Sequence, residues 1–331
     1  MGVAPTVISV AVDGTRPDAD GYVVETGGLS KRFGERIAVD SVDLRIRRGA
    51  AFGYLGPNGA GKTTLIRMLL GLTRPTAGSV RLLGRPMPQE RTQALARVGA
   101  IVEEPRFHPF LTGRENLAIV AAAREREAHG RIDAALTRVG LAARADDRVA
   151  KYSTGMRQRL GVARCLLGDP ELLLLDEPMN GLDPAGMEEF RELMAEFVAE
   201  GRTVVLSSHL LDEVEKTCDE VAIVDRGRIV VQGSVAELTR GSVQSLLLST
   251  NDDRRARELV AADERVAHVE PRGDGLVVEL RADRDVSLPP VAAELNRKLV
   301  LAGIAVCRLE HQHVSLERRF LELTSRLEHA A

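Results

Sequence analysis

A glycine-rich loop lies between a short apolar run and a segment with helical periodicity. The apolar run is Phe52–Leu55, the loop reads Gly-Pro-Asn-Gly-Ala-Gly-Lys-Thr over Gly56–Thr63, and apolar residues recur at helical spacing over Lys62–Leu72. The pattern G-x-x-x-x-G-K-[ST] between a strand and a helix is that of a phosphate-binding loop, in which backbone N–H groups and the helix N-terminus surround phosphate. This order predicts an α/β fold with a phosphate site at one edge of its sheet.

The residue types in this loop suit a nucleotide. Glycine lets backbone N–H groups converge on phosphate without a Cβ clash. The Lys62 ammonium is expected to bridge the β- and γ-phosphates, and the Thr63 hydroxyl to bind Mg²⁺. A chance glycine-rich turn is the alternative, but a chance turn does not require a strand before it and a helix after it. The residues expected to contact the nucleotide here are Gly56, Pro57, Asn58, Gly59, Ala60, Gly61, Lys62, Thr63 and Thr64.

Two adjacent carboxylates end another apolar run. Asp176 and Glu177 follow Leu172–Leu175 and precede Pro178. Acids at the end of a buried strand are rare without a cation or a proton transfer to serve. We expect Asp176 to hold Mg²⁺ through water and Glu177 to orient or polarise an attacking water. Two solvated acids at a helix start, favoured by the helix dipole, are the alternative.

A histidine follows the next apolar strand. His209 comes directly after the run Val204–Ser207. Most lone histidines are structural, and that interpretation stays open from the residue alone. Its position after the strand that succeeds the carboxylate strand makes His209 a candidate sensor of the γ-phosphate.

The remaining pattern predicts two folded parts. Strands alternate with helices, which indicates a mostly parallel sheet with a helical subdomain inserted at about residues 104–168. Residues 1–22 have no periodicity and are expected to form a loose tail, so the nucleotide-binding domain spans 23–240. The expected strands are Val42–Ile46, Phe52–Leu55, Ser79–Leu83, Val98–Val102, Leu172–Leu175, Thr203–Leu206 and Val221–Val224, and the expected helices include Glu115–Ala128, Ile132–Val139, Arg157–Leu167, Pro184–Glu200 and Leu210–Cys218.

The pattern of expected strands and helices changes after about Arg240. Between Ser245 and Leu309 the pattern reads β-α-β-β-α-β, the order of a small ferredoxin-like α+β domain, which we assign to residues 241–331. Ser315–Leu327 has the spacing of an amphipathic helix. We expect this domain to be an accessory or dimerisation unit, with a solvated appendage as the alternative.

Composition excludes several classes. A net charge of -3 gives no basic field for nucleic acid. The three cysteines have no metal-type spacing, which favours a reduced cytoplasmic setting. No apolar run approaches the roughly 18–20 residues of a membrane helix, and the N-terminus lacks the pattern of a secretion signal.

Taken together, the motifs resemble those of the ATP-binding subunit of ABC transporters. The resemblance covers roughly Glu25–Thr239 and includes five ordered motifs besides the phosphate loop: a Gln-loop region at Val98–Pro105, a signature at Tyr152–Met156, the Asp176-Glu177 strand, a D-loop at Asn180–Asp183 and the switch histidine His209.

The resemblance implies a shared nucleotide site. Two subunits would pair head to tail, and Ser153 and Gly155 of one subunit would cap the γ-phosphate of ATP bound to the other's phosphate loop, with Asp183 nearby. ATP and Mg²⁺ are the implied cofactors. The implied partners are a second copy of the chain and a separate integral-membrane permease, which would hold the protein at the inner face of the cell membrane.

Phe33 stands where the family has an aromatic residue that stacks on adenine, and Val39 is the second residue expected there. A stacked ring contributes about 0.5–1.5 kcal/mol beyond its burial. The alternative is that Phe33 is a core residue.

Two positions depart from the family pattern. Thr154 and Met156 replace a glycine and the glutamine of the usual signature Leu-Ser-Gly-Gly-Gln, while Ser153 and Gly155 are retained. Glu103 stands in place of the Gln-loop glutamine, where a carboxylate is still able to bind Mg²⁺ and take part in catalysis. In having an acid at this position, the chain resembles the branch of the family that exports bacitracin, lantibiotics and related antimicrobial compounds.

The C-terminal segment Ser315–Thr324 resembles the tail of ABC-2-type exporter ATPases, including the daunorubicin-resistance group. The segment Glu104–Leu111 carries Phe107, Pro109 and Phe110, and is expected to meet a permease helix, or else to fold back on the helical subdomain. The sequence thus predicts the ATPase of an antibiotic or drug exporter. A translation- or repair-type ABC ATPase and a regulatory module that does not hydrolyse ATP are the alternatives.

Overall fold

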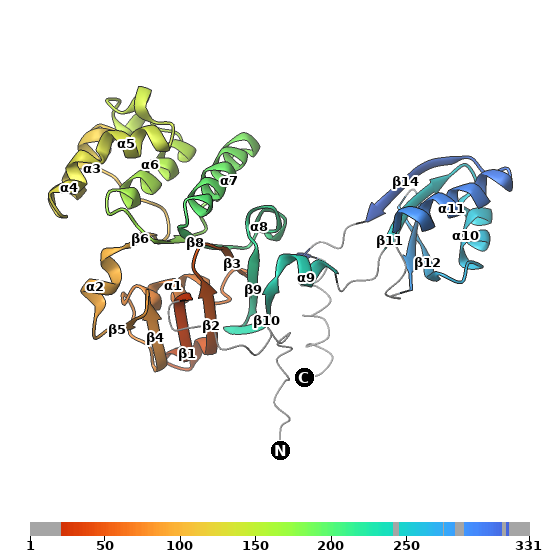
Figure 1. Cartoon of the computed structure of the whole chain (residues 1–331), viewed down its shortest axis with the longest axis horizontal. Helices are drawn as coiled ribbons and strands as arrows, with labels where there is room; N and C mark the ends of the chain where they lie inside the picture. Colours follow the sequence, from red (N-terminus) through yellow and green to blue (C-terminus); the bar gives the residue numbers. More distant parts are fainter. Residues whose placement is uncertain (1–20, 241–244, 274, 282–287, 313–315, 318–331) are drawn as a thin grey trace, which may run out of the picture. The chain divides into compact units, whose positions relative to one another are not determined.

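The computed structural model describes residues 21–240, 245–273, 275–281, 288–312 and 316–317, and the chain divides into two compact units that meet between Val235 and Ala236 (Figure 1). The first 20 residues of the predicted tail and most of the predicted helix Ser315–Leu327 lie outside the described residues. Tyr22, predicted to end the tail, instead begins the first strand, because the backbone there pairs with Arg47 of the second strand.

A six-stranded sheet with the order β10-β9-β3-β8-β7-β6 forms the centre of the first unit. All neighbouring pairs in it are parallel except β9 and β10. Its middle strands β3, β7 and β8 are buried along their whole length, as expected for parallel strands covered on both faces. The strands are β3 (Ala51–Leu55), β6 (Val98–Ile101), β7 (Leu172–Asp176), β8 (Thr203–Ser208), β9 (Glu220–Asp225) and β10 (Arg228–Ser234).

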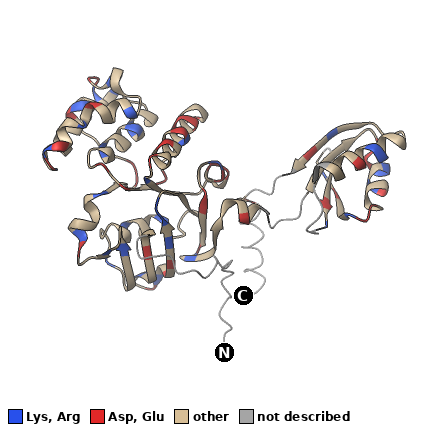
Figure 2. Cartoon of the chain, viewed as in Figure 1, with Lys and Arg blue, Asp and Glu red and all other residues tan. Residues whose placement is uncertain are grey.

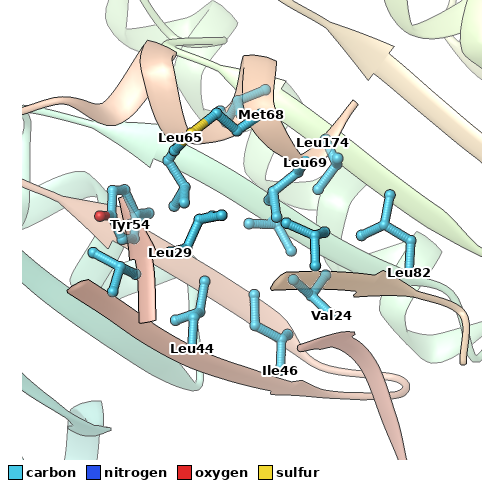
Figure 3. Close-up of a cluster of buried hydrophobic side chains, with 14 of the residues drawn as sticks. Val24, Leu29, Leu44, Ile46, Tyr54, Leu65, Met68, Leu69, Leu82 and Leu174 are labelled. Atoms are coloured by element: carbon cyan, nitrogen blue, oxygen red, sulfur yellow. The ribbon is translucent and has the colours of Figure 1, made fainter. Parts of the chain in front are cut away.

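A second, antiparallel sheet has the order β2-β1-β4-β5. Its strands are β1 (Tyr22–Phe33), β2 (Arg36–Arg47), β4 (Ala77–Leu82) and β5 (Arg85–Met87), and helix α1 (Lys62–Leu69) contacts both sheets. Leu65 and Leu69 of α1 belong to the same buried cluster as Leu44 and Ile46 of the second sheet and Leu174 of the first (Figure 3). Burial of the helix between two sheets fixes the position of its N-terminus.

The helical subdomain differs from the prediction at one point. The single helix expected over Glu115–Ala128 is wrong, because α3 (Gly113–Ala122) ends before α4 (Glu127–Gly130) begins. Residues 123–127 are all exposed, so no apolar side chain anchors a continuous helix there. The helix start is well specified, since Thr112 accepts a hydrogen bond from the Glu115 amide and the Glu115 carboxylate accepts one from the Thr112 amide. The other helices of the first unit are α2 (Arg91–Ala96), α5 (Ile132–Arg138), α6 (Thr154–Leu166), α7 (Pro184–Ala199) and α8 (Leu211–Thr217), and α9 (Val235–Arg240) follows.

In its described residues, the second unit has a four-stranded antiparallel sheet with the order β12-β13-β11-β14, to which helices α10 and α11 belong. Its elements follow one another as β-α-β-β-α-β, the order of a ferredoxin-like unit. They are β11 (Ser245–Thr250), α10 (Asp253–Ala261), β12 (Val266–Arg272), β13 (Gly275–Leu280), α11 (Leu288–Leu301) and β14 (Val306–Gln312).

Surface charge is mixed in sign over both units (Figure 2). Across the part of the chain that the structure describes, no helix has both the length and the apolar character needed to cross a lipid bilayer.

Candidate nucleotide-binding site

The phosphate loop connects β3 to α1 in a conformation that only glycine fits. Gly61 has φ +102°, and a Cβ there would lie 2.1 Å from the Ala38 carbonyl oxygen. A Cβ on Gly56 would lie 2.3 Å from the Val224 carbonyl oxygen. Helix α1 has no side-chain N-cap, so its first-turn N–H groups are left for a ligand. The N-terminus of α1 therefore has the geometry and the polarity of an anion site.

Lys62 brings a nearly buried positive charge to this helix start. Its side chain is 5% exposed and donates hydrogen bonds to the carbonyl oxygens of Gly56 (2.7 Å) and Pro57 (3.2 Å). Its Nζ also lies 3.1 Å from Oε1 of Glu177. A buried ammonium requires a negative partner, and Glu177 is that partner in this structure. A phosphate at the loop would compete with Glu177 for the same charge.

The carboxylate pair is oriented by the neighbouring strand. Asp176 is buried and accepts a hydrogen bond from the Ser207 hydroxyl at 2.5 Å. The Glu177 amide donates to both the hydroxyl (3.1 Å) and the carbonyl (3.2 Å) of Ser207. Glu177 has φ +49°, a strained conformation for a non-glycine residue of the kind that collects at functional sites. Sequence reasoning missed Ser207, although its place at the carboxyl end of a buried strand was a usable signal.

His209 completes a chain of contacts. Its Nδ1 lies 2.9 Å from Oε2 of Glu177, while the other carboxylate oxygen faces Lys62. The structure thus brings together the side chains of Lys62, Glu177 and His209, which lie far apart in the sequence. The Glu177 carboxylate lies between the buried Lys62 ammonium and the His209 imidazole, and each of its two oxygens contacts one of them.

A cavity of about 300 Å³ opens beside these residues. Phe33 lines it and is 53% exposed, so Phe33 is not a core residue, and the Lys31 ammonium lies 4.9 Å from the centre of its ring. Val39 differs from the expectation, because its side chain is fully buried in the core and reaches the loop only from behind Gly61. Sequence reasoning missed three lining residues, Arg36, Ala38 and Asn180.

Glu103 is placed away from this cavity. It is 60% exposed, has φ +61°, and pairs with Arg67 near the end of α1 at 2.7 Å. The Glu103 carboxylate is therefore engaged by the Arg67 guanidinium in this structure, and its expected part in holding Mg²⁺ stays a prediction.

Ser153, Gly155 and Asp183 line a second cavity of about 430 Å³, between the starts of α6 and α7. The Ser153 hydroxyl accepts a hydrogen bond from the Met156 amide at 3.2 Å, which caps α6. Asp183 caps α7 by accepting from the Gly186 amide at 2.9 Å. These residues are thus separate from the phosphate loop of their own chain.

The residues of the first cavity fit a nucleotide triphosphate with Mg²⁺. The loop supplies N–H donors and a buried ammonium for phosphate, and Thr63 supplies a hydroxyl oxygen in the cavity wall. Asp176, buried directly before the lining residue Glu177, supplies a carboxylate oxygen behind that wall. Among the described residues no three His, Cys, Asp or Glu side chains gather as a metal cluster. That donor set suits Mg²⁺, which takes one or two protein oxygens and shares the rest of its shell with water and substrate phosphates.

Comparison with known proteins places these features in a family. The family model described as "ABC transporter" matches residues 39–180. The chain is 37% identical to the bacitracin transport ATP-binding protein BcrA of Bacillus licheniformis, over 91% of this chain and 97% of that protein. It is 36% identical to the Nod factor export ATP-binding protein I of Ralstonia nicotianae, over 92% and 94% of the two chains. The structure of cbiO1 from Clostridium perfringens, part of the ABC transporter complex cbiONQ, superposes with a TM-score of 0.61 at 27% identity, over 66% of this chain and 90% of that one.

Proposed function

The chain belongs to the ABC transporter ATP-binding proteins and hydrolyses ATP, and from this premise we propose that it powers the export of an antibiotic or similar amphipathic compound through a separate membrane permease. The observation that carries the proposal is the Lys62–Glu177–His209 cluster at the uncapped start of α1. Relatives that match nine-tenths of the chain are named for bacitracin transport and Nod factor export, and none of the relatives described here favours a translation or repair role.

ATP binding rearranges charge within the cluster. The phosphate loop and Lys62 take the triphosphate, whose negative charge replaces that of Glu177 at the ammonium. Phe33, exposed at the mouth of the cavity, is free to stack on the base. Mg²⁺, when bound, neutralises charge on the phosphates, and Thr63 and Asp176 are the residues that would hold it.

Hydrolysis needs a group that orients water and takes its proton. Glu177, once released from Lys62, keeps its second oxygen beside His209 at 2.9 Å. Its backbone is fixed through two hydrogen bonds to Ser207, so the carboxylate is pre-positioned rather than mobile. We assign Glu177 as the general base and His209 as the residue that orients it and responds to the γ-phosphate.

The second cavity supports a head-to-tail dimer. Ser153 and Gly155 line a cavity whose residues differ from those around the chain's own phosphate loop. In the proposed dimer they face the nucleotide held by the partner subunit, where a helix N-terminus is a favourable neighbour for phosphate. We assign Glu103 to the Mg²⁺ of the chain's own nucleotide, which it would reach after its ion pair with Arg67 opens. Val39 supports the phosphate loop from the core.

The coupling surface for a permease lies on the helical subdomain. Phe110 is 79% exposed, while Phe107 is half-buried with the Arg164 guanidinium 5.4 Å from its ring centre. An exposed aromatic side chain held on a structured loop suits a short apolar helix of a membrane protein. Such docking would hold the protein at the cytoplasmic face of the membrane.

Export is tested by expressing the protein together with the membrane protein encoded beside its gene in a bacitracin-sensitive host. We expect the minimal inhibitory concentration of bacitracin, or of another amphipathic antibiotic in a panel, to rise. Lys62→Ala expressed to the same level is the matched control and should give no protection. A panel in which the wild-type pair protects against no compound contradicts the export proposal while leaving the ATPase intact.

A further inference from the structure

A buried polar group that the steps above do not use lies in the second cavity. Gln158 of α6 lines this cavity and is only 5% exposed. Its side-chain Oε1 has no hydrogen-bond partner. An unsatisfied buried acceptor carries the full desolvation penalty of that group, so native proteins rarely keep one without a reason. Other polar groups at this cavity do have partners, since Ser153 and Asp183 cap helices and Arg159 pairs with Glu189 at 3.0 Å.

The same cavity is lined by Gly181–Asp183 of the D-loop segment (residues 180–183) and by the start of α7. The start of α6 and the D-loop segment lie close together, since a Cβ added to Gly155 would be 3.4 Å from the Leu182 side chain and a Cβ added to Gly181 would be 3.3 Å from the Thr154 methyl group. Gly181 has φ +75°, so the segment turns sharply at this contact. The Asn180 and Leu182 amides of this segment already donate to the carbonyls of Glu177 and Met179, which leaves the Gly181 and Asp183 amides as the donors that it can offer to an amide oxygen.

The D-loop segment also leads directly to the catalytic cluster. The Asn180 amide donates to the Glu177 carbonyl at 3.1 Å, and Asn180 lines the first cavity together with Glu177 and His209. A displacement of residues 180–183 towards α6 therefore acts on Glu177 through two intervening residues, Pro178 and Met179. The two cavities are joined by this segment of the backbone.

We propose that Gln158 is a positioning residue, which accepts a backbone hydrogen bond from the D-loop segment when a nucleotide of the partner subunit binds at the Ser153 end of α6. The hydrogen bond draws the segment against α6 and sets Glu177 for water activation in the chain's own site. The unsatisfied Oε1 of Gln158 is the group that gains a partner on closure. This inference rests on the proposed dimer.

Gln158→Met tests the proposal, because methionine keeps the length of the side chain and removes the acceptor. We expect kcat for ATP to fall about fivefold, the equivalent of one hydrogen bond, with KM changed less than about twofold. The Tm of the nucleotide-free protein should stay equal or rise, since a buried unsatisfied acceptor is gone. Val162→Ala, a buried change on the same helix, is the control and should lower Tm while leaving kcat near the wild-type value.

A second measurement follows the segment itself. In a Glu177→Gln background, ATP should slow hydrogen exchange of the Gly181 or Asp183 amide, and Gln158→Met should remove that slowing. An unchanged kcat, or a fall of kcat and Tm together, overturns the positioning role. Failure of the wild-type protein to form an ATP-dependent dimer is a different result, because it removes the proposed dimer on which the inference rests.

Discussion

The starts of α1 and α6, which we propose as the two halves of a shared phosphate site, differ in their capping and their charge. Helix α1 begins without a side-chain cap, and the buried Lys62 ammonium at its start is paired with the Glu177 carboxylate. Helix α6 is capped by its own Ser153 and carries no buried cation at its first turn. The start of α1 supplies a positive charge and is expected to bind ATP without a partner subunit. The start of α6 supplies backbone donors that become useful only when a partner brings a nucleotide to them.

The largest expected effect is at the charged end. Lys62→Ala removes the buried ammonium, and we expect ATP affinity to fall roughly 100-fold, since charge-assisted hydrogen bonds contribute about 1.5–3 kcal/mol each. Titration with a fluorescent ATP analogue measures this, with the exposed Lys151→Ala as control. Unchanged affinity would show that α1 does not differ from α6 in the way described.

Glu177→Gln separates binding from turnover at the same end. Loss of a general base lowers turnover by about 100- to 10,000-fold, while ATP binding should remain or tighten because the negative charge beside Lys62 is gone. Steady-state phosphate release and size-exclusion chromatography with ATP give the two readouts. A variant that stays monomeric in ATP argues against the shared site.

Ser153→Ala probes the capped end. Loss of the cap costs about 1 kcal/mol of helix stability, and the variant should also lose turnover without losing ATP affinity in the monomer. Thr112→Ala removes a comparable cap from α3, which is remote from both cavities, and is the matched control. Equal turnover in the two variants would remove the functional distinction of α6.

The smallest expected effect is at Glu103, which belongs to neither helix start in this structure. Glu103→Gln breaks an exposed ion pair with Arg67 that is worth less than about 1 kcal/mol, so stability should barely change. Activity should survive with an altered dependence on Mg²⁺ concentration, measured as phosphate release across a Mg²⁺ series. An inactive variant would mean that the acid is indispensable, contrary to our expectation.

Sequence reasoning was strongest where contiguous residues carry the chemistry. The phosphate loop needs its glycines in sequence, and the Asp176-Glu177 pair ends a strand whose apolar run is readable by itself. It failed at Glu115–Ala128, because helical spacing alone does not show that the residues 123–127 are exposed and unanchored. It also placed Val39 at the ligand, although burial puts that side chain in the core.

Local patterns were sufficient to predict a phosphate loop, a carboxylate pair, a candidate γ-phosphate sensor at His209 and a signature helix, since each pattern has a local physical cause. Which of these residues meet depends on the tertiary structure. Parallel pairing of β7 with β8 brings Ser207 to Asp176, and packing of α1 between two sheets aims Lys62 at Glu177. The pairing of Glu103 with Arg67 and the unsatisfied amide of Gln158 are likewise contacts between distant segments. Contacts of this kind depend on how strands and helices pack, which no local pattern specifies.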